Sequence, residues 1–223
     1  TSLPSILKGD SSAVGAGISC TMTNEPLGVV AGITPFNFPA MVPLWMIPLA
    51  ITAGNCFILK PSEQTPLSAL KIAEYLQEAG LPDGVFSVLN GSREAVEGIC
   101  DHADVKAVAF VGSSNVAKIV YSRSTANGKR ALCLGGAKNH MIVVPDADQD
   151  STAKGLLASS MGSAGQRCMA ASVAVCVSEV DHIIDQLVEE AKIYELGVDM
   201  GTIASKTALD RIIGYIDEAE KMG

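Results

Sequence analysis

The sequence predicts an α/β protein built on a doubly wound parallel sheet. Short apolar runs alternate with longer segments of helical periodicity between residues 29 and 124. These runs are almost continuously apolar, as in strands that are buried on both faces. The composition agrees, because 48% hydrophobic and 18% charged residues over 223 positions support a large buried core rather than a disordered chain.

The alternating segments can be assigned in chain order. Strands are expected at residues 29–33, 56–59, 85–89 and 105–110, and helices at residues 38–53, 66–79, 93–100 and 113–124. Right-handed crossovers would place helices on both faces of this sheet. Ligands of such sheets bind beyond the carboxyl ends of the strands. Four loops are thereby selected, which follow Ile33, Leu59, Leu89 and Phe110.

After Lys129 the alternation starts again, and a domain boundary is expected near Gly135 and Gly136. Strands are expected at residues 130–134, 141–144 and 172–177, and helices at residues 151–161, 181–194 and 206–221. Residues 1–26 alternate only loosely, which is typical of a hairpin or an extended excursion.

One uncharged segment, residues 38–56, resembles a membrane span in composition. Pro39, Pro43 and Pro48 interrupt it, and it is short for a bilayer. We therefore expect a buried helix beside the sheet and no membrane partner. A signal peptide is not expected either, because no charged segment followed by an apolar one opens the chain.

Charge and cysteine content exclude further classes. A formal net charge of −8 argues against binding to a nucleic-acid backbone. The six cysteines form no C-x-x-C pair and no ligand spacing with the histidines, so no metal site is expected. Their scatter through apolar runs suits reduced, buried cysteines in a cytosol-like compartment, the cytoplasm of a bacterium or the mitochondrial matrix of a eukaryote.

The loop after residue 59 carries Lys60 and Glu63. At the carboxyl end of a strand, a lysine and a glutamate three residues apart can both reach a ribose, the lysine as donor and the glutamate as acceptor. The alternative is that Ser62 or Thr65 caps the next helix and the two charged side chains are solvated.

The loop after Phe110 carries Gly112 and Ser113. A glycine allows the backbone to approach a phosphate, and Ser113 would lie at a helix N-terminus, where free N–H groups favour an anion. The alternative is an ordinary N-cap serine. No G-x-G-x-x-G follows any expected strand, so the common dinucleotide fingerprint is absent from the sequence.

Asn37, in the loop after Ile33, has a side-chain amide that could contribute to an oxyanion hole. The alternative is a turn residue between two prolines.

Cys168 is the cysteine whose surroundings suggest chemistry. Arg167 precedes it, and a nearby guanidinium favours the thiolate, which is the nucleophilic form. The approach through residues 161–165 is small and rich in glycine, which leaves room for a substrate and for backbone N–H groups near an oxyanion. The alternative is a structural core cysteine, and no histidine can be paired with Cys168 from the sequence.

Three of these loops and the cysteine together resemble the aldehyde dehydrogenase superfamily. Its members carry P-F-N-F-P or P-W-N-F-P, K-P-S-E-x-T-P, F-x-G-S and G-x-x-C in this order. The matching segments are residues 35–39, 60–66, 110–113 and 165–168. Within the superfamily the chain is most similar to the CoA-acylating semialdehyde dehydrogenases, through residues 32–43, 136–140 and 165–170.

The resemblance implies roles for the matched residues. Cys168 would attack the aldehyde carbon, and the Asn37 amide with the Cys168 backbone N–H would hold the oxyanion. Arg167 would pair with the carboxylate of a semialdehyde substrate. The residues implied in NAD binding are Phe36, Lys60, Glu63, Gly112 and Ser113, with Lys60 and Glu63 on the adenosine ribose and Ser113 on the pyrophosphate.

The resemblance further implies oxidation of methylmalonate or malonate semialdehyde with NAD, transfer of the acyl group to CoA, and loss of CO₂ to give propionyl-CoA or acetyl-CoA. Hydrolytic relatives carry a glutamate base in an E-L-G-G-K run. Depending on whether the lysine or the glycine pair is matched, Leu134 or Cys133 stands at that position here. Without a carboxylate to activate water, a thioacyl enzyme should persist until a thiol accepts the acyl group.

As a family member, the chain would consist of an oligomerisation hairpin in residues 1–26, part of an NAD-binding domain in residues 27–135 and the N-terminal part of an α/β catalytic domain in residues 136–223. A homodimer or homotetramer is implied. Family members are about twice this long, and their E-x-F-G-P segment does not occur in the sequence. The alternatives are a hydrolytic aldehyde dehydrogenase of another specificity and a non-catalytic fragment or subunit.

Overall fold

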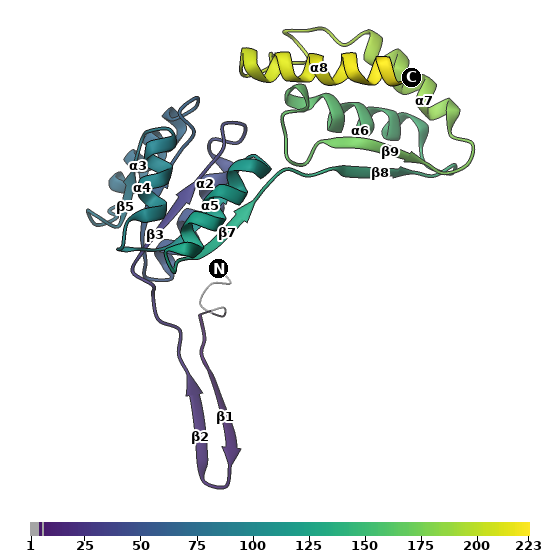
Figure 1. The fold of residues 1–223 in the computed structure, drawn as a ribbon. Helices are drawn as coiled ribbons and strands as arrows, with labels where there is room; N and C mark the ends of the chain where they lie inside the picture. The colour runs from purple at the N-terminus through teal and green to yellow at the C-terminus, as the bar shows by residue number, and fades with distance from the viewer. Residues whose placement is uncertain (1–4, 6) are drawn as a thin grey trace. The chain divides into compact units, whose positions relative to one another are not determined.

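The computed structural model describes Ser5 and residues 7–223 (Figure 1). The chain forms two compact units, the first ending at Gly136 and the second comprising Ala137–Gly223. Each unit has its own sheet and its own hydrophobic core. Within the described part of the chain, no helix is long and apolar enough to cross a bilayer.

The first unit contains the predicted parallel sheet. Its five strands lie in the order β5-β4-β3-β6-β7, and every neighbouring pair is parallel. The strands are β3 (Val29–Ile33), β4 (Cys56–Lys60), β5 (Phe86–Val88), β6 (Val105–Val111) and β7 (Arg130–Leu134). The chain builds outward from β3 on one side and then returns to add β6 on the other. This reversal of strand order is the point where open α/β sheets bind ligands.

Helices cover both faces of this sheet, as doubly wound topology requires. Helices α2 (Met41–Thr52) and α3 (Leu67–Glu78) contribute Ile47 and Ala69 to a core with Phe57 and Leu59. On the opposite face lie α4 (Arg93–Asp101) and α5 (Ser114–Ala126), whose buried residues pack on the other side chains of β3 and β6. The prediction of the α/β class is therefore confirmed.

The expectation that the apolar segment at residues 38–56 forms a buried helix was only partly correct. The helix α2 begins at Met41 and buries Val42 and Ile47, but Trp45 and Leu49 are exposed. Its sequence is apolar all round, so it contains no periodicity that would separate an inner from an outer face. Trp45 and Leu49 line an apolar groove of about 460 Å³ that continues over β6 and β7.

The second unit has a parallel pair, β8 (Asn139–Val143) and β9 (Ala171–Cys176). Between them run α6 (Gln149–Met161) and the short turn η1 (Gly162–Gly165), and α7 (Asp181–Lys192) and α8 (Lys206–Met222) follow (Figure 1). Val143 packs against Leu156 and Ile183 in its core. The strand expected at residues 141–144 in fact starts at Asn139, where pairing with Ala171 begins.

Residues 10–22 form an antiparallel hairpin of β1 (Asp10–Gly15) and β2 (Ile18–Met22). All its residues are exposed. Residues 1–4 and 6, which belong to the expected hairpin region, lie outside the described residues. The prediction that the cysteines are buried was wrong for Cys20 and Cys176, which are exposed. Cys100 is buried, and the other three are partly buried: Cys56, Cys133 and Cys168.

Two glycines of the first unit give a matched test of this packing. A Cβ on Gly32 in β3 would lie 2.5 Å from the Phe57 ring and 2.9 Å from the Met46 sulfur. We expect Gly32→Ala to lower the free energy of unfolding by about 1–3 kcal/mol because the core is already filled. In α4, a Cβ on Gly98 would meet no described atom within 4 Å. Gly98→Ala should therefore raise stability by roughly 0.5–1 kcal/mol.

Urea unfolding followed through Trp45, the single tryptophan, reports on the first unit. Equal unfolding midpoints for the two variants would contradict the packing described for Gly32.

Candidate active site

The loops that carry the predicted residues of the first unit meet at one edge of its sheet. Because β4 and β6 both pair in parallel with β3, Ile33 lies beside Lys60 on one side and Phe110 on the other. The Thr34 N–H donates to the Lys60 carbonyl at 3.1 Å. The Thr65 hydroxyl donates to the Phe36 carbonyl at 3.2 Å, so the loops after β3 and β4 are joined.

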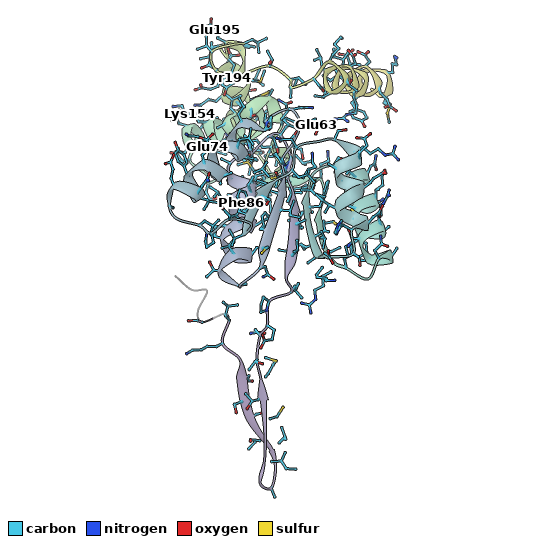
Figure 2. The ribbon with its side chains drawn as sticks, turned by 90° about the vertical axis from the view of Figure 1, so that its left-hand side faces the viewer. Glu63, Glu74, Phe86, Lys154, Tyr194 and Glu195 are labelled. Atoms are coloured by element: carbon cyan, nitrogen blue, oxygen red, sulfur yellow. The ribbon has the colours of Figure 1, made fainter. Side chains whose placement is uncertain are left out.

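Lys60 is almost fully buried, with 3% of its surface exposed. Its Nζ donates to the Gly91 carbonyl at 2.8 Å and lies 3.4 Å from Glu63 Oε2. The Glu63 side chain is 59% exposed and lies at the carboxyl end of the strands (Figure 2). A buried ammonium beside an exposed carboxylate presents a donor and an acceptor at the same edge.

The capping alternative for this loop was wrong. The N-cap of α3 is Pro66, and within the described residues it has no side-chain cap. Ser62 accepts from the Gln64 N–H at 3.3 Å, and Thr65 bonds the loop after β3.

Phe36 and Asn37 lie in the bend between β3 and α2. Both are half-buried, and Asn37 Oδ1 is shielded from solvent. The position is compatible with a turn residue and with an amide directed at a bound oxyanion, so both interpretations of Asn37 stand.

Gly112 and Ser113 connect β6 to α5. A Cβ on Gly112 would lie 2.6 Å from the Phe110 ring, and its N–H donates to the Leu134 carbonyl at 3.1 Å. Ser113 occupies the N-cap position, but among the described residues its hydroxyl accepts no capping bond. The first N–H groups of α5, which have no partner within the helix, are thus not taken by this serine.

The glycine pair after β7 approaches the same helix terminus. The Gly136 N–H donates to the Ser114 hydroxyl at 3.0 Å, and a Cβ on Gly135 would lie 2.9 Å from that oxygen. Gly135 therefore allows the close approach. It brings the end of β7 to the site edge of the first unit.

Cys133 and Leu134 point to opposite faces at this position, as neighbours in a strand do. Cys133 packs against the core beneath α4 and α5. Burial, followed by the neighbouring Cys100 thiol, raises the pKa of the Cys133 thiol. Leu134 is 46% exposed.

In the second unit, Cys168 lies in a tight turn between η1 and β9. The Ala170 N–H donates to the Arg167 carbonyl at 3.1 Å, so Cys168 is the second residue of a β-turn. The Asn139 amide donates to the Cys168 carbonyl at 2.7 Å and to the Ala170 carbonyl at 3.0 Å. Cys168 as a residue is half-buried.

Arg167 is bound to the end of α6. Its Nη2 donates to the Ala158 carbonyl at 2.5 Å and to the Ser159 carbonyl at 3.0 Å, both in the last turn of the helix. A Cβ on Gly162 would lie 2.6 Å from this guanidinium. The cation thus binds carbonyls at the C-terminal end of α6, where the helix dipole favours a positive charge.

The backbone of the segment before the cysteine turn is strained. Ser163, Ala164 and Gly165 have φ angles of 54°, 53° and 70°, a left-handed turn of three residues. Residues other than glycine avoid this conformation because their Cβ comes too close to the following carbonyl oxygen. Strain of this kind is typical of functional sites.

The structure therefore assembles two groups of predicted residues. Phe36, Asn37, Lys60, Glu63, Gly112 and Ser113 share the carboxyl edge of the first sheet. Cys168 and Arg167 share a turn in the second unit. Sequence reasoning did not anticipate the supporting contacts of three residues. Asn139 and Ser159 bind backbone groups around Cys168, and Gly135, named only as a domain boundary, allows the close approach to Ser114. Only Asn139 had a sequence signal, because it lies in the run of residues 136–140 that contributed to the family resemblance.

Comparison with known proteins agrees with this arrangement. The sequence model of the aldehyde dehydrogenase family matches residues 2–223, and the chain belongs to this family. A malonate-semialdehyde dehydrogenase of Pseudomonas aeruginosa is 50% identical over 99% of the chain and 46% of its own length. One from Bacillus mycoides is 49% identical over 94% of the chain and 45% of its own length.

Two crystal structures are similar throughout. Methylmalonate-semialdehyde dehydrogenase from Oceanimonas doudoroffii is 50% identical with a TM-score of 0.93, over 99% of this chain and 47% of that one. A structure from Sinorhizobium meliloti 1021 complexed with NAD is 46% identical with a TM-score of 0.94, over the same shares. The chain spans about half the length of the curated relatives it matches.

The left-handed turn yields a prediction. Ala164→Gly should raise the free energy of unfolding of the second unit by about 1 kcal/mol, because glycine removes the Cβ conflict. Ala158→Gly, in the regular helix α6, should instead lower it by about 1 kcal/mol. Native-state hydrogen exchange of the β9 amides measures both changes. Destabilisation by Ala164→Gly would show that the turn is not strained.

Proposed function

We propose that the chain takes part in an NAD-dependent, CoA-acylating oxidation of malonate or methylmalonate semialdehyde. The observation that carries this proposal is the turn that presents Cys168, in a chain half identical to malonate-semialdehyde dehydrogenases. The products would be acetyl-CoA or propionyl-CoA and CO₂.

The first unit fits a dinucleotide at its carboxyl edge. The N–H groups at the start of α5, which Ser113 does not cap, suit a pyrophosphate. Lys60 and Glu63 supply a buried donor and an exposed acceptor for ribose hydroxyls, and Phe36 and Gly112 lie in the flanking loops. When bound, NAD supplies the hydride acceptor.

The proposed chemistry begins at Cys168. Its thiolate attacks the aldehyde carbon, a C–S bond forms, and the carbonyl electron pair moves to oxygen. The Cys168 N–H and the Asn37 amide would stabilise this oxyanion. Collapse of the oxyanion would release the aldehyde hydrogen as a hydride, for which bound NAD would supply the acceptor, and would leave a thioester on Cys168.

The substrate carboxylate then leaves as CO₂. Its bonding electrons pass into the thioester as an enolate, which takes a proton from solvent. Attack by the CoA thiolate forms the new thioester, and Cys168 leaves as a thiolate. Arg167 is proposed to hold the substrate carboxylate through Nη1, since Nη2 is bound to α6.

The choice of a thiol over water is proposed to follow from the end of β7. Leu134 is exposed there and carries no acid or base, and Cys133 faces the core. A water molecule would lack a general base at this position, so the acyl enzyme would await CoA.

The units and the hairpin are assigned in the same proposal. Residues 27–135 would form part of the NAD-binding domain and residues 136–223 would begin the catalytic domain; the two compact units divide one residue later, after Gly136. The exposed hairpin β1–β2 would mediate a homodimer or homotetramer. A non-catalytic role is the second candidate, because the chain spans about half of its relatives. Calorimetric titration with NAD separates the two, since absence of binding favours the second.

Replacing the nucleophile tests the first chemical step. We expect Cys168→Ala to abolish the single-turnover burst of NADH with malonate semialdehyde, because no other group would take the acyl product. Cys176→Ala, which removes an exposed cysteine in the same unit, should retain the burst. In the unmodified chain, steady turnover should require CoA. A burst that survives in Cys168→Ala would contradict the assignment.

Replacing Leu134 tests the acyl acceptor. Leu134→Glu should produce NADH turnover without CoA, because a carboxylate there could activate water. Leu132→Glu, two residues earlier on the same face of β7 and 62% exposed, should not. Stopped-flow and steady-state NADH absorbance measure both. Equal CoA dependence in the two variants would exclude this position as the site of the missing base.

A further inference from the structure

We propose that Asn139 is the positioning residue for the nucleophile: it fixes the peptide group that follows Cys168. This inference rests on the proposed function in that it takes Cys168 as the reacting group. The observation behind it is that one side-chain amide binds both carbonyls that flank Met169.

The two bonds match the chemistry of the asparagine amide. Its Nδ2 carries two protons, so it can donate to the Cys168 and Ala170 carbonyls at the same time. Both distances, 2.7 Å and 3.0 Å, are those of well-formed hydrogen bonds. Asn139 itself is held as the first residue of β8, where its backbone pairs with Ala171.

The Cys168 carbonyl belongs to the central peptide of the β-turn from Arg167 to Ala170. In a turn this peptide can face two ways, and its flip exchanges the type I and type II geometries. A type II turn requires a positive φ at its third residue, which is Met169 here. The positive φ angles of this segment end at Gly165, so the turn is of type I. The donor on Asn139 holds the carbonyl in that orientation.

A fixed carbonyl also fixes the next N–H. In a planar trans peptide, C=O and N–H point in opposite directions, so the Met169 N–H must point away from Asn139. The Ala170–Ala171 peptide is held at both ends, since Asn139 binds the Ala170 carbonyl and the Ser159 hydroxyl accepts the Ala171 N–H at 3.1 Å. Cys168 is thereby presented on a turn with one permitted backbone orientation.

Asn139→Asp keeps the shape of the side chain but replaces the donor with an acceptor that repels both carbonyls. We expect the Ala170 amide to exchange with deuterium roughly tenfold faster, because the turn loses the bonds that hold it closed. The β9 amides should keep their protection. Gln149→Glu is the matched control, because it removes a hydrogen bond that the Gln149 side-chain amide donates to the His182 carbonyl in the same unit.

The second measurement is kinetic. In Asn139→Asp the rate constant of the NADH burst should fall about tenfold or more, whereas half-saturation by the semialdehyde and by NAD should stay within about twofold. A residue with only a structural role would lower the active fraction and leave the rate constant unchanged. Gln149→Glu should change neither quantity.

Unchanged exchange at Ala170 or an unchanged burst rate constant would overturn the inference. If Asn139→Asp removes the exchange protection of all β9 amides, Asn139→Ala takes its place. This variant removes the same donors without adding charge, and the same two measurements, exchange at Ala170 and the burst rate constant, apply to it. If the unmodified chain gives no burst, the proposed function fails, and exchange at Ala170 alone then decides the role of Asn139.

Discussion

The parallel pairing of β3 with β4 and β6 is the constraint on which the first unit depends. β3 is buried except at its first residue, and its register sets Ile33 level with Lys60 and Phe110. A slip of one residue would turn every core side chain to the opposite face. The same register brings the loops with Asn37, Lys60 and Ser113 to one edge. Core packing and the geometry of the site are therefore specified together.

Much of this unit could be predicted from the sequence, because its strands are uninterrupted apolar runs bounded by turn residues. The strands at residues 29–33 and 130–134 were predicted with their observed bounds. The helix α2 shows where such reasoning fails, because an evenly apolar segment does not reveal which side faces the core. The start of β8 was missed for a related reason: Asn139 is polar, and its strand character comes from pairing with Ala171.

The candidate site likewise contains residues that could be predicted from the sequence and residues that could not. Residues within the family motifs could be found because the order of the motifs is itself a signal. The supporting residues could not, because their bonds join segments far apart in sequence: Asn139 binds carbonyls 29 and 31 residues away. An asparagine that ends a glycine-rich loop has no spacing that indicates such contacts. Only the folded backbone shows that β8 and the cysteine turn are neighbours.

Arg167 illustrates why adjacency in sequence is a weak guide to electrostatics. The guanidinium next to Cys168 was expected to favour the thiolate, but its Nη2 binds carbonyls at the end of α6. That contact anchors the first residue of the turn, Asn139 anchors the central peptide, and Ser159 binds the N–H of Ala171, the residue after the turn. Three anchors on a four-residue turn and the residue after it, together with the left-handed segment before it, indicate that this region orients the backbone around Cys168. In the proposed reaction, a nucleophile that meets first an aldehyde and then a thiol would gain most from such preorganisation.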